Sequence, residues 1–195
     1  MAYYRHVGLI GKARVGKDTV AAMLGQRFGY ERVAFADRLK EAALRVDPII
    51  GHELFADEAE PVYLREAVAL HGWDFVKDEY EEARRFLQSY GQTIREADPG
   101  FWIRAAWPAM DAITARKLPV VVSDVRYENE ADHLRRAGYL LIRVVRHNDK
   151  TLTGEAARHP SETELDSYPA DVTISNAGTL KELHSIVSSL RLDRR

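Results

Sequence analysis

A glycine-bounded loop near the start of the chain constrains the fold more than any other stretch. Residues 7–10 form a short apolar run, and Gly-Lys-Ala-Arg-Val-Gly-Lys-Asp-Thr follows from Gly11 to Thr19. Apolar side chains then recur at helical spacing as far as Phe28. A strand, a glycine-rich loop ending in lysine and a helix form the layout of a phosphate-binding P-loop. The alternative is an ordinary glycine turn between a strand and a helix.

The chemistry of this loop suits phosphate oxygens. Its backbone amides and the positive end of the following helix attract anions, and Lys17 adds a mobile positive charge for the outer phosphates. One position departs from the usual pattern, because Asp18 follows the lysine where Ser or Thr is common. Either Thr19, one place later, supplies the hydroxyl that meets Mg²⁺, or Asp18 reaches the metal directly or through water.

Composition narrows the class of protein. The chain has 195 residues, of which 46% are hydrophobic and 30% charged, and this suits one globular domain with a substantial core. A net charge of −2 argues against a nucleic-acid polymer as partner. The chain has no cysteine and no apolar run near ~18 residues, so neither disulfides nor a membrane span are expected. A first strand this close to residue 1 leaves no room for a signal peptide, and a cytoplasmic location is expected.

Segments with strand character alternate with segments of helical character. The expected strands are 6–10, 32–35, 119–124, 139–145 and 171–175. Helices are expected at 17–28, 80–95 and 100–116. A further expected helix is capped by Asp37 and ended by Pro48, and another is ended by Gly138. The last expected helix begins with a capping box at 179–182. The stretch 51–78 is expected to be irregular, with a short helix at 62–70.

This alternation predicts the α/β class, a three-layer P-loop NTP-binding fold with a mainly parallel, doubly wound sheet. Ligands then lie beyond the carboxyl ends of the strands, where the glycine loop sits. We expect a single P-loop domain over 1–195. It would have a core of 1–47 and 117–195, a helical substrate-binding region of 48–116 and a lid of 147–168.

Two charged residues follow the buried run 120–122. In P-loop proteins an acid at the position of Asp124 holds Mg²⁺, usually through water, and the competing interpretation is a helix N-cap. The planar guanidinium of Arg126 suits a phosphate. Taken alone, a surface ion pair of Arg126 with Glu128 or Glu130 is the simpler interpretation.

Further cations and aromatic residues lie in the sequence between the glycine loop and Asp124. Arg38 and Lys40 either place positive charge beside the P-loop for a second phosphate-bearing substrate or belong to a solvated helix face. Arg85 lies on an arginine-rich helix of the kind that usually faces solvent, but Gly91 in the same helix marks close approach by a ligand or backbone. Trp102 is either a nucleobase platform or, more commonly for a residue at helical spacing, part of a core.

The region 147–169 is the longest loop-like segment that follows a strand. It comes after Arg143 and Arg146 and is rich in polar and cationic side chains. Such a loop can close as a lid over phosphates, or it is a plain surface loop. His159 is expected to serve as a hydrogen-bonding or hinge residue, because no second histidine stands at metal-ligand spacing.

Five blocks of this sequence resemble, in order, those of phage-type deoxynucleoside monophosphate kinases. The first is the loop end at 16–19, with Asp after the lysine. Phe-Ala-Asp-Arg-Leu-Lys at 35–40 is similar to the family's Phe-Ala-Asp-Pro-Leu-Lys, with Arg38 replacing proline. The remaining blocks lie at 87–92 with 101–102, at 124–130, and at 159–162 with 171–179. Their common order spans nearly the whole chain and is more specific than any single block, although Gln92 stands where Thr is common.

The resemblance implies ATP on the loop and a deoxynucleoside monophosphate as second substrate. The expected ATP contacts are Gly11, Arg14, Val15, Gly16, Lys17, Asp18, Thr19 and, from the lid, Arg146. The expected substrate contacts are Ala13, Leu39, Lys40, Arg85, Gly91, Trp102, Arg126, Glu130, His159 and Glu162. One family member has lysine at the place of Ala13, so that contact is missing here or moved to Lys12 or Arg14. The family also implies a homodimer.

These expectations combine into one reaction, transfer of the γ-phosphoryl group of ATP to a (deoxy)nucleoside monophosphate. The reaction needs aligned phosphates and neutralised charge. The expected catalytic residues are Lys17, Arg85, Asp124 and Arg126, the expected Mg²⁺ ligands are Asp18, Thr19 and Asp124, and Arg146 or Arg158 would close from the lid. Two alternatives stay open. One is a small-molecule kinase that acts on dephospho-coenzyme A or phosphomevalonate, and the other is a nucleotide-binding regulator or NTPase.

Overall fold

A computed structural model describes residues 4–55, 58–146 and 160–193, apart from the side chain of Phe55. The chain forms two compact units. The sheet unit consists of Met1–Phe35 and Ile103–Arg195, and the insertion unit consists of Ala36–Trp102.

The sheet unit is built on a five-stranded parallel sheet with the strand order β2-β5-β1-β6-β7. The strands are β1 (Val7–Ile10), β2 (Glu31–Val33), β5 (Val120–Val125), β6 (Leu140–Val145) and β7 (Val172–Ser175). Every residue of β1 is buried, as continuous apolar runs in a parallel sheet predict. The mainly parallel α/β fold predicted from the sequence is therefore confirmed.

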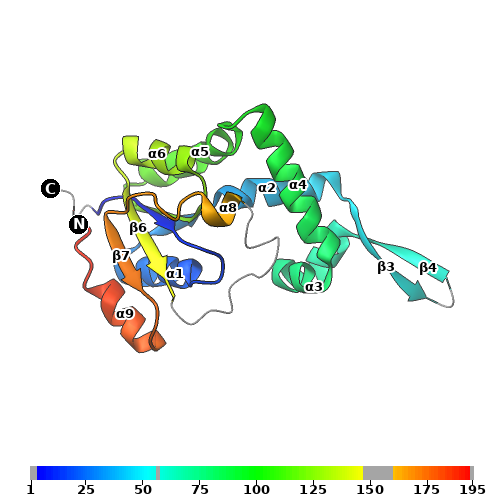
Figure 1. Ribbon diagram of the computed structural model, residues 1–195, viewed down its shortest axis with the longest axis horizontal. Coiled ribbons are helices and arrows are strands. Elements are labelled where there is room, and N and C mark those ends of the chain that lie inside the picture. Colours follow the sequence, from blue (N-terminus) through cyan, green and yellow to red (C-terminus); the bar gives the residue numbers. More distant parts are fainter. Residues whose placement is uncertain (1–3, 56–57, 147–159, 194–195) are drawn as a thin grey trace. The chain divides into compact units, whose positions relative to one another are not determined.

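Helices cover both faces of this sheet (Figure 1). On one face α1 (Lys17–Phe28) and α9 (Leu180–Ser188) pack over a core that includes Leu9, Leu24 and Ile142. On the other face α5 (Phe101–Ala115) and α6 (Glu128–Arg136) pack over a second core with Val122 and Leu134. The sheet and the helices on its two faces form the three layers that the alternation of strands and helices predicts.

The insertion unit contains helices and a hairpin. Its elements are most of α2 (Phe35–Val46), the antiparallel pair β3 (Ile49–Phe55) and β4 (Glu58–Tyr63), α3 (Leu64–Glu79) and α4 (Glu81–Ala97). A small core of its own includes Ile50, Leu64 and Val76. The helix α3 is broken at Gly72, whose φ of 79° and ψ of 166° are not helical.

The sequence prediction for 51–78 is wrong in part: the short helix expected at 62–70 lies largely within the longer α3, but a hairpin replaces the irregular stretch before it. The hairpin was missed because its side chains do not alternate between apolar and polar: Glu58, Ala59 and Glu60 are all exposed, and Leu54 is 82% exposed. Asp37 does not cap α2 either, since this helix begins two residues earlier at Phe35. Its carboxylate lies in the first turn, where the helix dipole favours negative charge.

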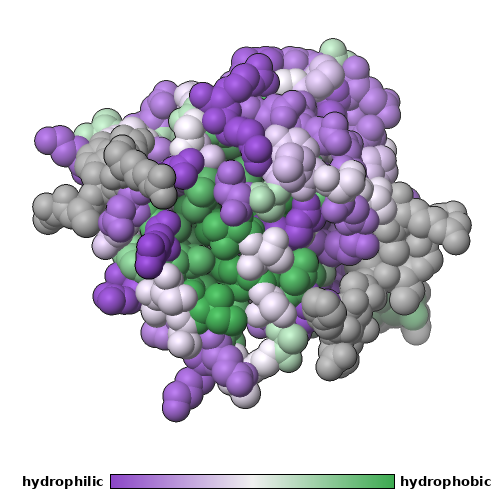
Figure 2. Space-filling view, turned by 60° about the vertical axis from the view of Figure 1, so that its left-hand side comes forward, coloured by the Kyte–Doolittle hydropathy of each residue, from purple (hydrophilic) through white to green (hydrophobic). Residues whose placement is uncertain are grey.

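Other element ends follow the sequence closely. The bounds of α1 are those expected, and α9 begins with the capping box of Thr179 and Glu182. None of the described helices is long and apolar enough to cross a membrane. The face shown in Figure 2 is mostly hydrophilic, with hydrophobic residues gathered in a central area.

Candidate active site

The glycine loop joins β1 to α1 and has a backbone that requires glycine. Gly11 has a φ of 137° and Gly16 a φ of 101°, both in the region that residues with side chains rarely adopt. A Cβ atom on Gly11 would overlap the backbone oxygen of Val144. Gly16 is the N-cap residue of α1, and no side chain caps this helix. The helix amides therefore face the loop without a side-chain acceptor, as a phosphate site requires.

Lys17 is the first residue of α1 and is only 7% exposed. Its Nζ donates hydrogen bonds to the backbone oxygens of Gly11 and Lys12, each at 2.7 Å. Burial, followed by the nearby Arg126 guanidinium, lowers the pKa of Lys17 from 10.5 to about 7. The carboxylates of Glu162, Asp124 and Asp18 act in the opposite direction on this pKa. The lysine therefore lies at the centre of a group of charges.

Asp124 lies at an irregularity of β5. Gly8 of β1 pairs with Val122 and Ile10 with Val125, so β5 holds one residue more than β1 over this stretch. Such bulges re-aim side chains near active sites. The carboxylate Oδ1 of Asp124 accepts a hydrogen bond from the backbone N of Phe35 at 2.8 Å.

The interpretation of Asp124 as the N-cap of the next helix is wrong, because Tyr127 is the N-cap residue of α6. Asp124 instead binds the first amide of α2, a helix far away in the sequence. A sequence does not show such a partner.

Arg126 forms neither of the surface ion pairs that the sequence suggested. Its Nη1 donates to Glu162 Oε1 at 2.7 Å and to the backbone oxygen of Ser161 at 3.3 Å. Its backbone N donates to Glu130 Oε2 at 2.8 Å. Glu130 is 1% exposed and belongs to the capping box of α6.

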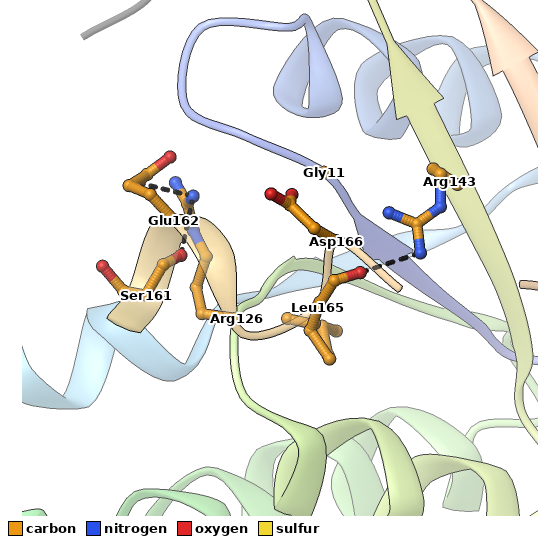
Figure 3. A pocket seen from close by; sticks show the side chains of 8 residues that line it. Gly11, Arg126, Arg143, Ser161, Glu162, Leu165 and Asp166 are labelled. Atoms are coloured by element: carbon orange, nitrogen blue, oxygen red, sulfur yellow. Dashed lines mark hydrogen bonds and ion pairs between the residues drawn. The ribbon is translucent and has the colours of Figure 1, made fainter. Parts of the chain in front are cut away.

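Glu162 belongs to the short helix α8 (Pro160–Thr163) and contacts the glycine loop as well as Arg126. Its Oε2 accepts a hydrogen bond from the backbone N of Ala13 at 2.6 Å. Figure 3 shows Glu162 beside Arg126 at a pocket next to Gly11. The pocket is lined by Gly11, Val125, Arg126, Arg143, Ser161, Glu162, Leu165 and Asp166.

The remaining ATP and metal candidates lie on or near the loop. Val15 is buried, while Asp18 is exposed and lies 3.4 Å from Arg32. Arg14 adopts a φ of 62° and is exposed, as is Arg146 after β6. Thr19 is half-buried in the first turn of α1. His159 and the segment 147–159 lie outside the described residues.

Sequence reasoning assigned no role to Asn176, which supports the loop from β7. Its Nδ2 donates to the backbone oxygen of Val15 at 2.8 Å, and it is 8% exposed. A Cβ atom on Gly16 would overlap this amide group. The available signal was that Asn176, like Asp124, is a polar residue where an expected strand ends.

The insertion unit brings together three of the predicted substrate residues. Trp102 Nε1 donates to the backbone oxygen of Gly91 at 3.2 Å, and a Cβ on Gly91 would come within 3.0 Å of Leu39 Cδ2. Trp102 is 4% exposed, as its interpretation as a core residue expects. The close approach at Gly91 is thus made by Leu39.

Two further predicted substrate residues of this unit are cationic. Lys40 Nζ lies 5.6 Å from the ring centroid of Trp73. The side chain of Arg85 is 66% exposed and pairs with Glu81 and Glu82 of its own helix.

Comparison with known proteins identifies the family. A family model described as deoxynucleotide monophosphate kinase matches residues 52–187. The chain belongs to the deoxynucleotide monophosphate kinase family. A relative described as a putative deoxynucleotide monophosphate kinase of Acanthamoeba polyphaga mimivirus is 26% identical over 196 residues, covering 94% of each chain. An uncharacterized protein ORF76 of Ictalurid herpesvirus 1 is 28% identical over 112 residues, covering 56% of this chain and 46% of that protein.

Solved structures of similar fold are also kinases. A sugar kinase of Janibacter sp. HTCC2649 matches with a TM-score of 0.50 and 14% identity, over 94% of this chain and 91% of its own. A dephospho-CoA kinase of Campylobacter jejuni matches with a TM-score of 0.50 and 12% identity, over 95% of both chains. These structures share the fold. Membership of the deoxynucleotide monophosphate kinase family makes this chain a nucleotide kinase that transfers a phosphoryl group.

Proposed function

We propose that the protein transfers the γ-phosphoryl group of Mg·ATP to the phosphate of a deoxynucleoside monophosphate. An oxygen of the acceptor phosphate would form a bond to the γ-phosphorus while the bond to the bridging oxygen of ADP breaks. The acceptor dianion has no proton to lose, so the protein needs to align and neutralise the phosphates rather than supply a base. Buried Lys17, with Arg126 and Asp124 within electrostatic range, is the observation that carries this proposal.

The donor phosphates would bind the loop Gly11–Thr19. The glycine-containing backbone of the loop and the N-terminus of α1, which no side chain caps, offer amide donors. When phosphate arrives, Lys17 Nζ would exchange its contacts with Gly11 and Lys12 for phosphate oxygens. A phosphate beside the ammonium stabilises its charged form. Bound ATP would therefore keep Lys17 protonated at pH values above the pKa that Lys17 has in the protein without ATP.

Mg²⁺ would accompany ATP, and the donor set fits it. Within the described residues no three His, Cys, Asp or Glu side chains cluster so as to hold a metal by themselves. Mg²⁺ typically takes one or two carboxylates and completes its shell with water and phosphate oxygens. Asp124 and Asp18 are both close enough to influence Lys17. We propose that they and the Thr19 hydroxyl hold the ion, which would neutralise phosphate charge.

For the acceptor we propose the cationic contacts that the family resemblance implies, Arg126, Lys40 and Arg85. Leu39, Gly91 and Trp102 would shape the nucleoside side of the site. Arg85, Gly91 and Trp102 lie within the range 52–187 that the deoxynucleotide monophosphate kinase family model matches. The proposal also includes ATP contacts from Arg14 and Arg146 and a substrate contact from His159. It further includes a homodimeric enzyme in the cytoplasm.

The deciding experiment is a coupled ADP-release assay with Mg·ATP and a panel of all deoxy- and ribonucleoside monophosphates. Strong stimulation by one or several deoxynucleotides is the expected result and would identify the acceptor. ATP hydrolysis that is equally fast without any acceptor would favour an NTPase instead. ATP binding without stimulation by any nucleotide would redirect the search to acceptors such as dephospho-coenzyme A.

A further inference from the structure

Glu162 touches two parts of the proposed site that come from different strands. One carboxylate oxygen accepts from the Ala13 amide of the loop after β1, and the other accepts from Arg126 after β5. We infer that Glu162 is a positioning residue that fixes Arg126 relative to the glycine loop, and so aligns the acceptor phosphate with the donor phosphates. The inference rests on the proposed function for its assignment of Arg126 to the acceptor.

The burial of this carboxylate makes it more than a surface ion pair. The side chain of Glu162 is 10% exposed and that of Arg126 is 24% exposed. The bonds to Ala13 N and to Arg126 Nη1 measure 2.6 and 2.7 Å. Short charge-assisted bonds that are shielded from water restrict both partners more strongly than exposed pairs do.

The way in which Arg126 is held leaves one edge of its guanidinium for a ligand. The side-chain hydrogen bonds of Arg126 to Ser161 O and to Glu162 Oε1 both use Nη1. Within residues 4–55, 58–146 and 160–193, no partner is found for its Nε and Nη2. These two nitrogens form the parallel pair of donors that binds a phosphate in bidentate fashion. Glu162 therefore orients Arg126 without occupying this edge.

The segment that carries Glu162 is itself firmly attached to the sheet unit. We call residues 160–168 the strap. Glu164 Oε1 accepts from the backbone N of Glu128 at 2.8 Å, and Leu165 is buried in the second core. Arg143 donates to the backbone oxygens of Leu165 and Tyr168. The strap thus holds Glu162 in place before any substrate binds.

Glu164 provides a matched control. It is two residues away on the same strap and also accepts a hydrogen bond from a backbone N, but from that of Glu128 at the start of α6 rather than from the glycine loop or Arg126. A purely structural role of the strap predicts similar effects for Glu162→Gln and Glu164→Gln. A positioning role predicts an effect on catalysis for Glu162→Gln alone.

The experiment measures kcat and KM for both substrates, melting temperature and ADP affinity by calorimetry in three variants. Glu162→Gln is expected to lower kcat about 100-fold, because misplacement by about 1 Å costs that much, and Glu164→Gln is expected to stay within about twofold. Glu162→Asp keeps the charge but is too short to bridge both partners, so it should also lose rate. In an Arg126→Ala background, Glu162→Gln should lower kcat further by less than about threefold, because its effect passes through Arg126.

Any of three results would overturn the inference. The first is a wild-type kcat in Glu162→Gln or Glu162→Asp, and the second is an equal loss of kcat in Glu162→Gln and Glu164→Gln. The third is that the effects of Glu162→Gln and Arg126→Ala on kcat are additive. A wild-type protein inactive on every deoxynucleotide would instead refute the proposed function. The link to Ala13 would then still be tested by ADP affinity, which should weaken in Glu162→Gln and not in Glu164→Gln.

Discussion

Arg126 and Arg85 carry the same charge, but the two units hold them in different ways. Arg126 is mostly buried and bound to an even more buried glutamate from a distant segment. Arg85 is exposed and pairs with glutamates three and four residues away on its own helix. Exposed helical pairs stabilise by only about 0.3–0.5 kcal/mol and exchange readily with other anions. The sheet unit therefore presents a preformed cation, whereas Arg85 of the insertion unit is free to reorient toward a ligand.

The largest expected effect concerns Lys17, the most buried cation of the site. Lys17→Met should lower kcat at least about 1,000-fold because it removes the charge that faces the outer phosphates. The fold should persist and even gain stability, since a buried ammonium is costly.

The sign of this gain follows from the pKa of Lys17, which is about 7 in the folded protein and 10.5 otherwise. The unfolded chain binds the extra proton between these values, so the cost of Lys17 is fully present below about pH 7 and fades toward pH 10.5. Thermal melts should show the largest advantage of Lys17→Met at about pH 6. An advantage that grows with pH would contradict the burial of a charged Lys17.

Asp124→Asn should separate metal binding from structure. Asn retains an oxygen that can accept from the amide of Phe35, so the melting temperature should change little. Loss of the negative charge should lower kcat by roughly 100-fold and shift the Mg²⁺ titration to higher concentration. An unchanged metal titration would leave Asp124 with a purely structural role at the start of α2.

The comparison of the two arginines is tested directly by Arg126→Ala and Arg85→Ala. Arg126→Ala leaves the buried Glu162 carboxylate without its cation and should cost roughly 2 kcal/mol of the free energy of unfolding. Arg85→Ala should cost less than about 0.5 kcal/mol, although both should raise KM for the acceptor. Urea unfolding measures the first difference and steady-state kinetics the second. Equal destabilisation by the two substitutions would remove the distinction between the units.

The smallest effect is expected at Gly91. Alanine there gains up to about 1 kcal/mol of helix propensity, but its Cβ would press on the flexible end of Leu39. The two effects should nearly cancel in thermal melts. Gly11→Ala is the contrasting substitution, because its Cβ would meet rigid backbone at a positive φ, and it should destabilise the sheet unit markedly. A large loss for Gly91→Ala would show that Leu39 cannot yield.

The sequence predicted the sheet unit well because its signals are local. Buried parallel strands are continuous apolar runs such as 120–122, and the spacing of the glycines indicates the backbone conformation of the loop. The hairpin of the insertion unit lacks such a signal, since Leu54 and the glutamates of β4 are exposed. Ile50 packs into the core of the insertion unit, while residues 52–55 and 58–61 face each other in the cross-strand backbone pairing.

The partners within the site were beyond sequence reasoning for a different reason. Ala13 and Glu162 are 149 residues apart, and Asp124 and Phe35 are 89 apart. Residue types at these positions are informative, and both acids were expected at the site. Which atom each acid contacts depends on packing of segments distant in the chain, which spacing does not determine.

The position of β1 in the middle of the sheet has a consequence for how the protein opens. Each side of β1 is paired, with β5 and with β6, and the strand is fully buried. Amide hydrogens of such central strands exchange with solvent only when the whole unit unfolds, whereas a two-stranded hairpin such as β3–β4 exchanges through local opening. In deuterated water the strand that carries the phosphate-binding loop should thus be labelled last. The site for the donor nucleotide then persists through every partial unfolding event that spares the sheet.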